Sequence, residues 1–130
     1  MQIAFLIGRI IFGLYWISAG WNHFRQLEGI SQYAKAKGTP APKLAVGGTG
    51  AILVLGGLSM LLGVYPHIGI ALLIIFLVGV TFRIHDFWND ADPQMRQNNI
   101  INFTKNLGLL GALLMLLFLP LPWPYSVPLG

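Results

Sequence analysis

The stretch LAVGGTGAILVLGGLSMLLGV-YPH-IGIALLIIFLVGVTFRI, residues 44–84, holds two apolar runs separated by only three residues. Each run, 44–64 and 68–84, is close to the roughly 20 residues with which a helix crosses the ~30 Å hydrocarbon core of a bilayer. Backbone groups cannot stay unpaired in lipid, so both runs are expected to be helices. A link from Tyr65 to His67 leaves room only for an antiparallel hairpin.

Two further apolar runs, 3–21 and 100–119, lie on either side of this hairpin, and a proline-rich tail follows at 120–130. Only 9% of the 130 residues are charged and 55% are hydrophobic, whereas a soluble domain carries about 25% charged residues. The sequence therefore predicts an all-α fold, an integral membrane four-helix bundle that forms a single domain over 1–130, and excludes a soluble globular enzyme.

The charged residues gather at one end of this expected bundle. Seven of the eight basic residues and all four acids lie in or beside the connections 22–43 and 85–99, and Arg9 alone lies towards the other end. The positive-inside rule then places both connections in the cytoplasm and both termini outside. The net charge of +4 is thus an orientation signal, and we expect a lipid bilayer, not nucleic acid, as the partner.

The first connection carries a second, shorter helical pattern. Phe24, Leu27, Ile30 and Ala34 recur at helical spacing, which predicts a short amphipathic helix lying at the membrane interface between the first two spans. In the tail, Trp123 is expected to anchor in the headgroup region, as aromatic residues do at membrane interfaces. Tyr125 is expected to do the same.

The first span carries the first candidate site. At 100° per residue, one face of this helix presents a cation, an indole, an imidazole and two gaps, namely Arg9, Gly13, Trp16, Gly20 and His23. A charge inside a span marks function or a buried partner by default, so this face could line a pocket for an anion, a quinone-like ring or a lipid headgroup. In the alternative interpretation, Arg9 extends to the nearer interface.

The end of the third span carries the second candidate. His85, Asp86 and Trp88 combine an imidazole, a carboxylate and an indole at the interface, which would suit a proton relay or a headgroup site. The alternative is an aromatic belt in which Trp88 is an anchor and the charges are solvated.

The third candidate opens the fourth span. Asn99, Asn102 and Asn106 lie on one side of this helix, which indicates hydrogen bonds between helices or a small hydrated cavity; we favour the hydrogen bonds. The spacing of the three histidines predicts no metal site, although His23 and His85 both end helices at the charged end. With no cysteine in the chain, thiolate chemistry by this chain alone is excluded.

Several short strings occur in an order that is specific in combination, although each string is weak alone. They are Gly8-Arg9-Ile10-Ile11-Phe12-Gly13, Tyr33-Ala34, Gly38-Thr39-Pro40-Ala41-Pro42, Gly56-Gly57, His85-Asp86-Phe87-Trp88 and Asn102-Phe103-Thr104-Lys105-Asn106. In these strings the chain resembles the DoxX family of small bacterial membrane proteins, over nearly its whole length to about Leu117.

The resemblance implies a four-helix protein of the bacterial inner membrane, associated with quinone-linked or thiol-based membrane oxidoreductases. On this basis we expect an accessory subunit of a membrane redox complex, with a quinone as the candidate cofactor and no catalytic residue identified. Two alternatives stay open: a protein that binds or transports a small molecule or lipid, and a structural bundle that forms homo-oligomers through Gly56 and Gly57.

Overall fold

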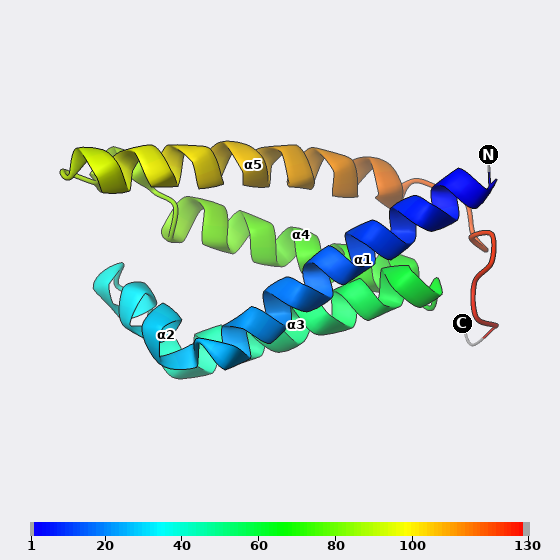
Figure 1. Ribbon diagram of the computed structural model, residues 1–130, viewed down its shortest axis with the longest axis horizontal. Helices are drawn as coiled ribbons and strands as arrows, with labels where there is room; N and C mark the ends of the chain where they lie inside the picture. The colour runs from blue at the N-terminus through cyan, green and yellow to red at the C-terminus, as the bar shows by residue number, and fades with distance from the viewer. Residues whose placement is uncertain (1, 129–130) are drawn as a thin grey trace.

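The computed structural model describes residues 2–128, which form helices joined by short connections (Figure 1). Four helices are long and apolar enough to cross a membrane, as expected for an integral membrane four-helix protein. The elements are α1 (Gln2–Arg25), α2 (Leu27–Ala36), α3 (Pro42–Leu62), α4 (Pro66–Arg83), the 3-10 helix η1 (Phe87–Asn89) and α5 (Pro93–Leu117).

The helices begin close to the expected spans, except that α5 starts at Pro93, well before the apolar run at 100–119. Asp92 caps this helix, because its Oδ2 accepts the backbone N–H of Met95 over 3.1 Å. A proline at the first helical position suits such a start, since its missing N–H has no helical partner there. The polar first turns of α5 thus extend beyond the apolar span.

Glycines set the contact between α1 and α3, which cross closely (Figure 1). A Cβ atom on Gly13 would lie 2.9 Å from the Gly57 carbonyl oxygen, and one on Gly57 would lie 2.7 Å from that of Gly13. One on Gly20 would lie 2.6 Å from the Gly50 carbonyl oxygen. The absence of side chains therefore lets the two backbones approach to a distance that any Cβ would prevent.

The link between α3 and α4 is the expected tight hairpin. Gly63 ends α3 with φ +70°, a left-handed conformation that glycine adopts without strain. The Ser59 hydroxyl donates to the carbonyl of Val64 over 2.7 Å, and Pro66 starts α4. Gly56 faces Leu73 of α4. Since Gly56 and Gly57 are both covered by helices of the same chain, neither offers a free face to a second copy.

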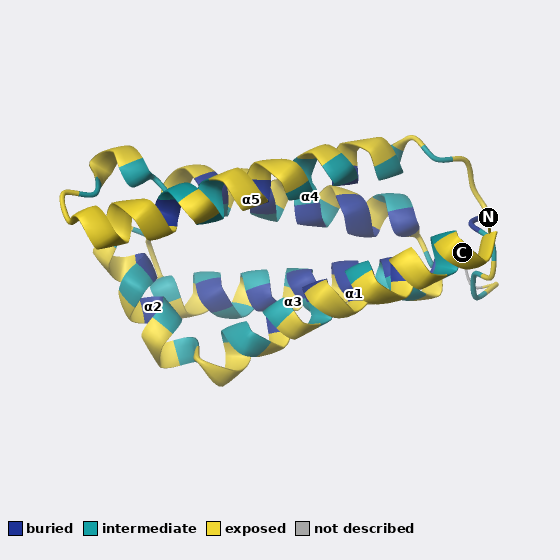
Figure 2. Ribbon diagram, turned by 45° about the horizontal axis from the view of Figure 1, so that its top comes forward, coloured by how far each residue is buried: buried dark blue, intermediate teal, exposed yellow. Residues whose placement is uncertain are grey.

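Away from this link α3 and α4 diverge, and α2 lies at the open end (Figure 1). α1 packs on α3 and α5 packs on α4. Between α1 and α5 no pair of Cα atoms lies within 8 Å anywhere in the described chain. Buried residues of α3 and α4 gather on the sides that face each other (Figure 2). Side chains such as Trp16 and Leu113, which are 2% and 0% exposed, fill the space between the two pairs.

The tail departs from expectation. Trp123 is only 3% exposed and packs edge-to-face on Phe5 of α1, with 5.4 Å between ring centroids. Its assignment as a headgroup anchor is therefore wrong, because the first turns of α1 offer it an aromatic partner inside the fold. Tyr125 is 61% exposed.

Candidate ligand-binding site

Arg9 is buried at the end of the bundle opposite α2 and is 4% exposed. Its Nε donates to the Met60 carbonyl over 3.1 Å, and its Nη2 donates to the Leu61 carbonyl over 3.1 Å. Its Nη1 donates to the carbonyl of Pro124. The last carbonyls of a helix lack partners within the helix, so the guanidinium caps α3 and fastens the tail. A ligand contact for Arg9 stays a prediction.

At the other end, residues of all five α-helices enclose a partly open cavity of about 450 Å³, which we call the polar chamber. Its buried wall includes Trp16, Leu77 and Asn106. Its exposed lining residues are Tyr15 on α1, Gln26 and Gly29 beside and on α2, and Lys105 on α5, so the open side of the cavity is bordered by these three helices. The volume falls within the range of about 300–1,000 Å³ that is typical of small-molecule sites.

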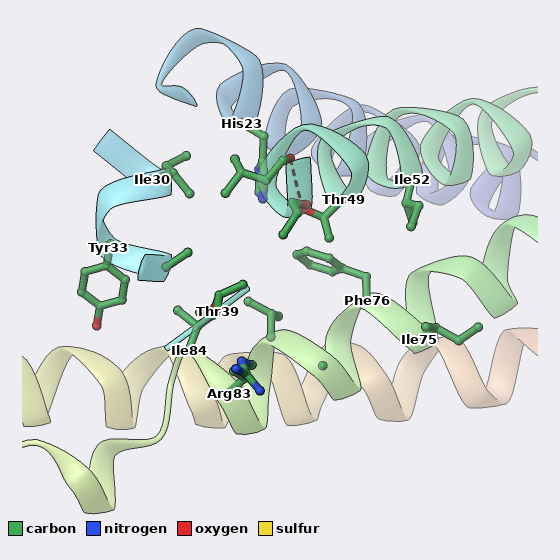
Figure 3. A pocket seen from close by; sticks show the side chains of 15 residues that line it. His23, Ile30, Tyr33, Thr39, Thr49, Ile52, Ile75, Phe76, Arg83 and Ile84 are labelled. Carbon is green, nitrogen blue, oxygen red and sulfur yellow. Dashed lines mark hydrogen bonds between the residues drawn. The ribbon is translucent and has the colours of Figure 1, made fainter. Parts of the chain in front are cut away.

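A second cavity of about 290 Å³, the apolar chamber, adjoins the first between α2, α3 and α4 (Figure 3). Both chambers share His23 and Phe76, whose rings meet edge-to-face with centroids 6.0 Å apart. Figure 3 shows Ile52 and Ile75 on the walls of the apolar chamber, with Arg83 on the side opposite His23. The two chambers are therefore adjacent and are separated in part by these two rings.

A cluster of polar side chains, which we call the latch, joins α2 to the connection after α4 and to α5. The Nζ of Lys37 donates to Asp86 over 2.6 Å and to Asp90 over 2.7 Å. The Nδ2 of Asn99 donates to Asp90 over 2.6 Å and to the hydroxyl of Tyr33 over 3.0 Å. These bonds hold α2 across the open end of the helices.

The latch is ionised at neutral pH. Burial by itself lowers the pKa of Lys37, but its hydrogen bonds to Asp86 and Asp90 outweigh this effect and raise the pKa above its ordinary value. The hydrogen bonds from Lys37 and then Asn99 hold the pKa of the Asp90 carboxyl below its usual range. With the ammonium and the carboxylates all charged, attraction between them stabilises the closed position of α2.

The structure brings four of the predicted site residues together. Trp16, His23, His85 and Asn106 all line the polar chamber, although they come from α1, from the connection after α4 and from α5. The two histidines that end helices at the charged end, His23 and His85, thus line the same cavity. Among residues 2–128, no three His, Cys, Asp or Glu side chains lie close enough to hold a metal ion.

The other predicted residues lie elsewhere. Gly13 and Gly20 are in the contact with α3, and Asp86 belongs to the latch. Trp88 is 51% exposed and packs on Phe103 with ring centroids 5.8 Å apart. Asn102 is half-buried and lines neither chamber. These positions leave the chambers to a smaller set of side chains than the sequence suggested.

Sequence reasoning missed the part that Tyr33, Lys37 and Asp90 play beside the site. Lys37 lies 49 and 53 residues from its two carboxylate partners, and no local spacing reports such a pairing. For Asn99 the favoured hydrogen bonding between helices is confirmed, because its amide contacts both α2 and the connection after α4.

The fold and site define a small four-helix membrane protein with a ligand-sized cavity at one end. The chain belongs to the DoxX family, whose model matches residues 4–86. It is 30% identical over 114 residues to inner membrane protein YphA of Escherichia coli (strain K12), and the match covers 88% of this chain and 81% of that protein. No solved structure matches significantly. The chain is thus a multi-pass inner-membrane protein.

Proposed function

We propose that this protein is an accessory subunit of a membrane redox complex and that it holds a lipophilic ring of the quinone type in the polar chamber. The observation that carries the proposal is the composition of that chamber. Trp16 and Phe76 offer aromatic walls, while His23, His85 and Asn106 offer polar groups between them. A quinone has a matching division between a flat apolar ring and polar atoms at its edge.

The accessory role follows from what the chain itself can do. It contains no cysteine, so a thiol–disulfide step requires a partner protein. A bound quinone would supply two-electron chemistry, and the protein's share would be to hold the ring and fix its orientation. The chain's own residues would then act by binding and positioning, and the electron donor would be another subunit of the complex.

The test uses the full-length protein purified with native lipid in a mild detergent. Organic extraction and chromatography should yield about one quinone per chain. The variant Asn106→Leu, which removes the amide but keeps a similar volume, should lose most of it. The matched control is Asn102→Leu, since Asn102 lies on the same helix and lines neither chamber. Equal quinone content in both variants would show that the polar chamber does not bind the quinone.

The accessory role needs its own measurement. Chemical cross-linking in the native membrane, followed by mass spectrometry, should recover an oxidoreductase subunit linked to this chain. If the protein carried quinone but cross-linked to no such subunit, quinone binding would be supported and the accessory role would be rejected.

A second candidate function, binding or transport of a lipid, is favoured by the apolar chamber alone. Its walls are almost entirely hydrocarbon, which suits an acyl chain. Mass spectrometry of the same extract distinguishes the two candidates, because a retained phospholipid with no quinone would favour the lipid.

A further inference from the structure

The orientation of the Asn99 side chain is fixed by its neighbours. The Asp90 carboxylate can only accept hydrogen bonds, and it lies 2.6 Å from Asn99 Nδ2. The same nitrogen lies 3.0 Å from the Tyr33 hydroxyl. The amide nitrogen must therefore face Asp90, and the amide oxygen must face the other way.

That oxygen determines which nitrogen of His85 carries the proton. Asn99 Oδ1 lies 2.9 Å from His85 Nδ1, and an amide oxygen only accepts. The proton of the neutral ring is therefore on Nδ1, which donates to Asn99. The Nε2 atom of His85 is left as an unprotonated acceptor.

His23 reaches the same tautomer by a different route. Its Nδ1 lies 2.9 Å from the backbone carbonyl oxygen of Ala19, one turn earlier in α1. A carbonyl oxygen cannot donate, so the proton of the neutral ring is again on Nδ1. The Nε2 atom of His23 is a second free acceptor.

Both rings line the polar chamber. Neither Nε2 has a hydrogen-bond partner in the described chain. Both atoms keep some accessible surface, because neither is among the fully buried polar atoms that lack a partner. The indole Nε1 of Trp16, in contrast, is fully buried and has no hydrogen-bond partner in the described chain. Two imidazoles that line the chamber thus each carry a lone pair without a protein partner, and the Asn106 amide can either donate or accept.

We infer that the polar chamber selects a ligand that presents hydroxyl groups, with the Nε2 atoms of His23 and His85 as the acceptors that determine specificity. A hydroxyl would donate a hydrogen bond to these atoms. A carbonyl oxygen is itself an acceptor, so its lone pairs would repel those of Nε2. If the ligand is of the quinone type, as in the proposed function on which this step rests, the chamber should bind the reduced quinol more tightly than the oxidised quinone. No proton or electron is transferred in this step, which is recognition alone.

The test compares two probes, 4-nonylphenol and its methyl ether 4-nonylanisole, in which a methyl group replaces the hydroxyl proton, bound to the full-length protein in lipid nanodiscs at pH 8. The phenol should bind about tenfold more tightly per mole in the lipid, which corresponds to one or two neutral hydrogen bonds. Equal binding of the two probes, tighter binding of the ether, or binding of neither probe would overturn the inference.

Asparagine substitutions separate the acceptor from the fold. An asparagine can offer its amide N–H near the position of Nδ1, and its amide oxygen then lies near the position of Cδ2. His85→Asn and His23→Asn therefore keep the donor and lose the acceptor at the Nε2 position. Each should reduce the preference for the phenol, and the double variant should abolish it. The control is His67→Asn at the opposite end, where the ring contacts the Leu119 carbonyl. A preference retained in the double variant would overturn the inference.

A second probe pair separates this inference from the proposed function. Decylubiquinol should bind more tightly than decylubiquinone, and equal or reversed affinities would overturn the selectivity while leaving quinone binding intact. If the protein preferred the phenol but bound neither decyl compound, the proposed function would be rejected and the hydroxyl-selective site would be supported. If the protein bound a zinc ion through both histidines and showed no preference for the phenol, the inference would be overturned in favour of a metal site.

Discussion

Arg9 donates through Nε to the carbonyl of Met60, 51 residues later, over 3.1 Å. The bond joins the second turn of α1 to the last turn of α3, and further bonds reach Leu61 and Pro124. A cation within a membrane span thus has protein carbonyls as partners, and its contribution to stability can be measured separately from any ligand.

Arg9→Met should destabilise the protein and leave the quinone content of the polar chamber unchanged, because Arg9 does not line that chamber. The substitution removes three charge-assisted hydrogen bonds and leaves buried carbonyls without partners, and we expect a loss of about 3 kcal/mol in the free energy of unfolding. Denaturation with SDS in mixed micelles measures this loss. Arg9→Lys should be intermediate, since one ammonium cannot reproduce the guanidinium fork. Full stability with lost quinone would instead make Arg9 a ligand contact.

Gly20→Ala should weaken the contact between α1 and α3. The new Cβ atom would lie 2.6 Å from the backbone oxygen of Gly50, which cannot move without shifting α3. We expect a loss of about 2 kcal/mol in the free energy of unfolding, as in other overpacked cores. Gly8→Ala is the control, because a Cβ there meets nothing within 4 Å, and its stability should be unchanged or slightly raised. Equal effects of both substitutions would contradict the close approach.

Lys37→Met should release α2 from the connection after α4. Because the chain has no cysteine, Ser31→Cys introduces a single thiol at a position on α2 that is 3% exposed. Its rate of labelling by a maleimide should rise severalfold when Lys37 is replaced. Lys35→Met is the matched control, since Lys35 is an exposed lysine in the last turn of α2, two residues before Lys37. An unchanged rate in Lys37→Met would show that the latch does not hold α2.

The latch should also open in acid. The folded-state pKa of Asp90 is lowered by Lys37 and Asn99, so its stabilisation is complete above the unfolded value of about 3.9 and is lost as the pH falls towards the lower folded value. The accessibility of Cys introduced at Ser31, followed by a label that reacts in acid, should be flat from about pH 5 to 8 and should increase below that range. An increase near neutral pH would contradict this assignment.

The charge distribution predicts the orientation of the chain. We propose that the latch end faces the cytoplasm, because seven of the eight basic residues lie towards it. Alkaline phosphatase fused after Gly130 should then be active, and a green fluorescent protein at the same position should be dark. The reverse pattern would invert the topology.

The features that depend on neighbours in sequence were predictable. The face that carries Arg9, Gly13, Trp16 and Gly20 follows from helical periodicity alone, and all four residues are buried as one side of α1. The apolar runs and the short link likewise predicted the spans and the hairpin, because lipid permits few other backbone conformations.

The features that depend on distant partners were not predictable. The latch joins Lys37 to carboxylates about fifty residues away, and the burial of Trp123 depends on its packing against the first turns of α1. An interfacial tryptophan and a buried one look the same in sequence, because the ring suits either place. Only the three-dimensional arrangement decides between them.

The open side of the polar chamber has a consequence for any ligand of this protein. Its exposed lining residues lie on α1, at α2 and on α5, and we expect a lipophilic molecule that has partitioned into the bilayer to reach the chamber from this side. Occupancy is then governed by the mole fraction of the molecule in the bilayer, and its aqueous concentration matters only through partitioning. Adding lipid at a constant total amount of ligand would dilute the ligand and empty the site, although no residue of the protein had changed.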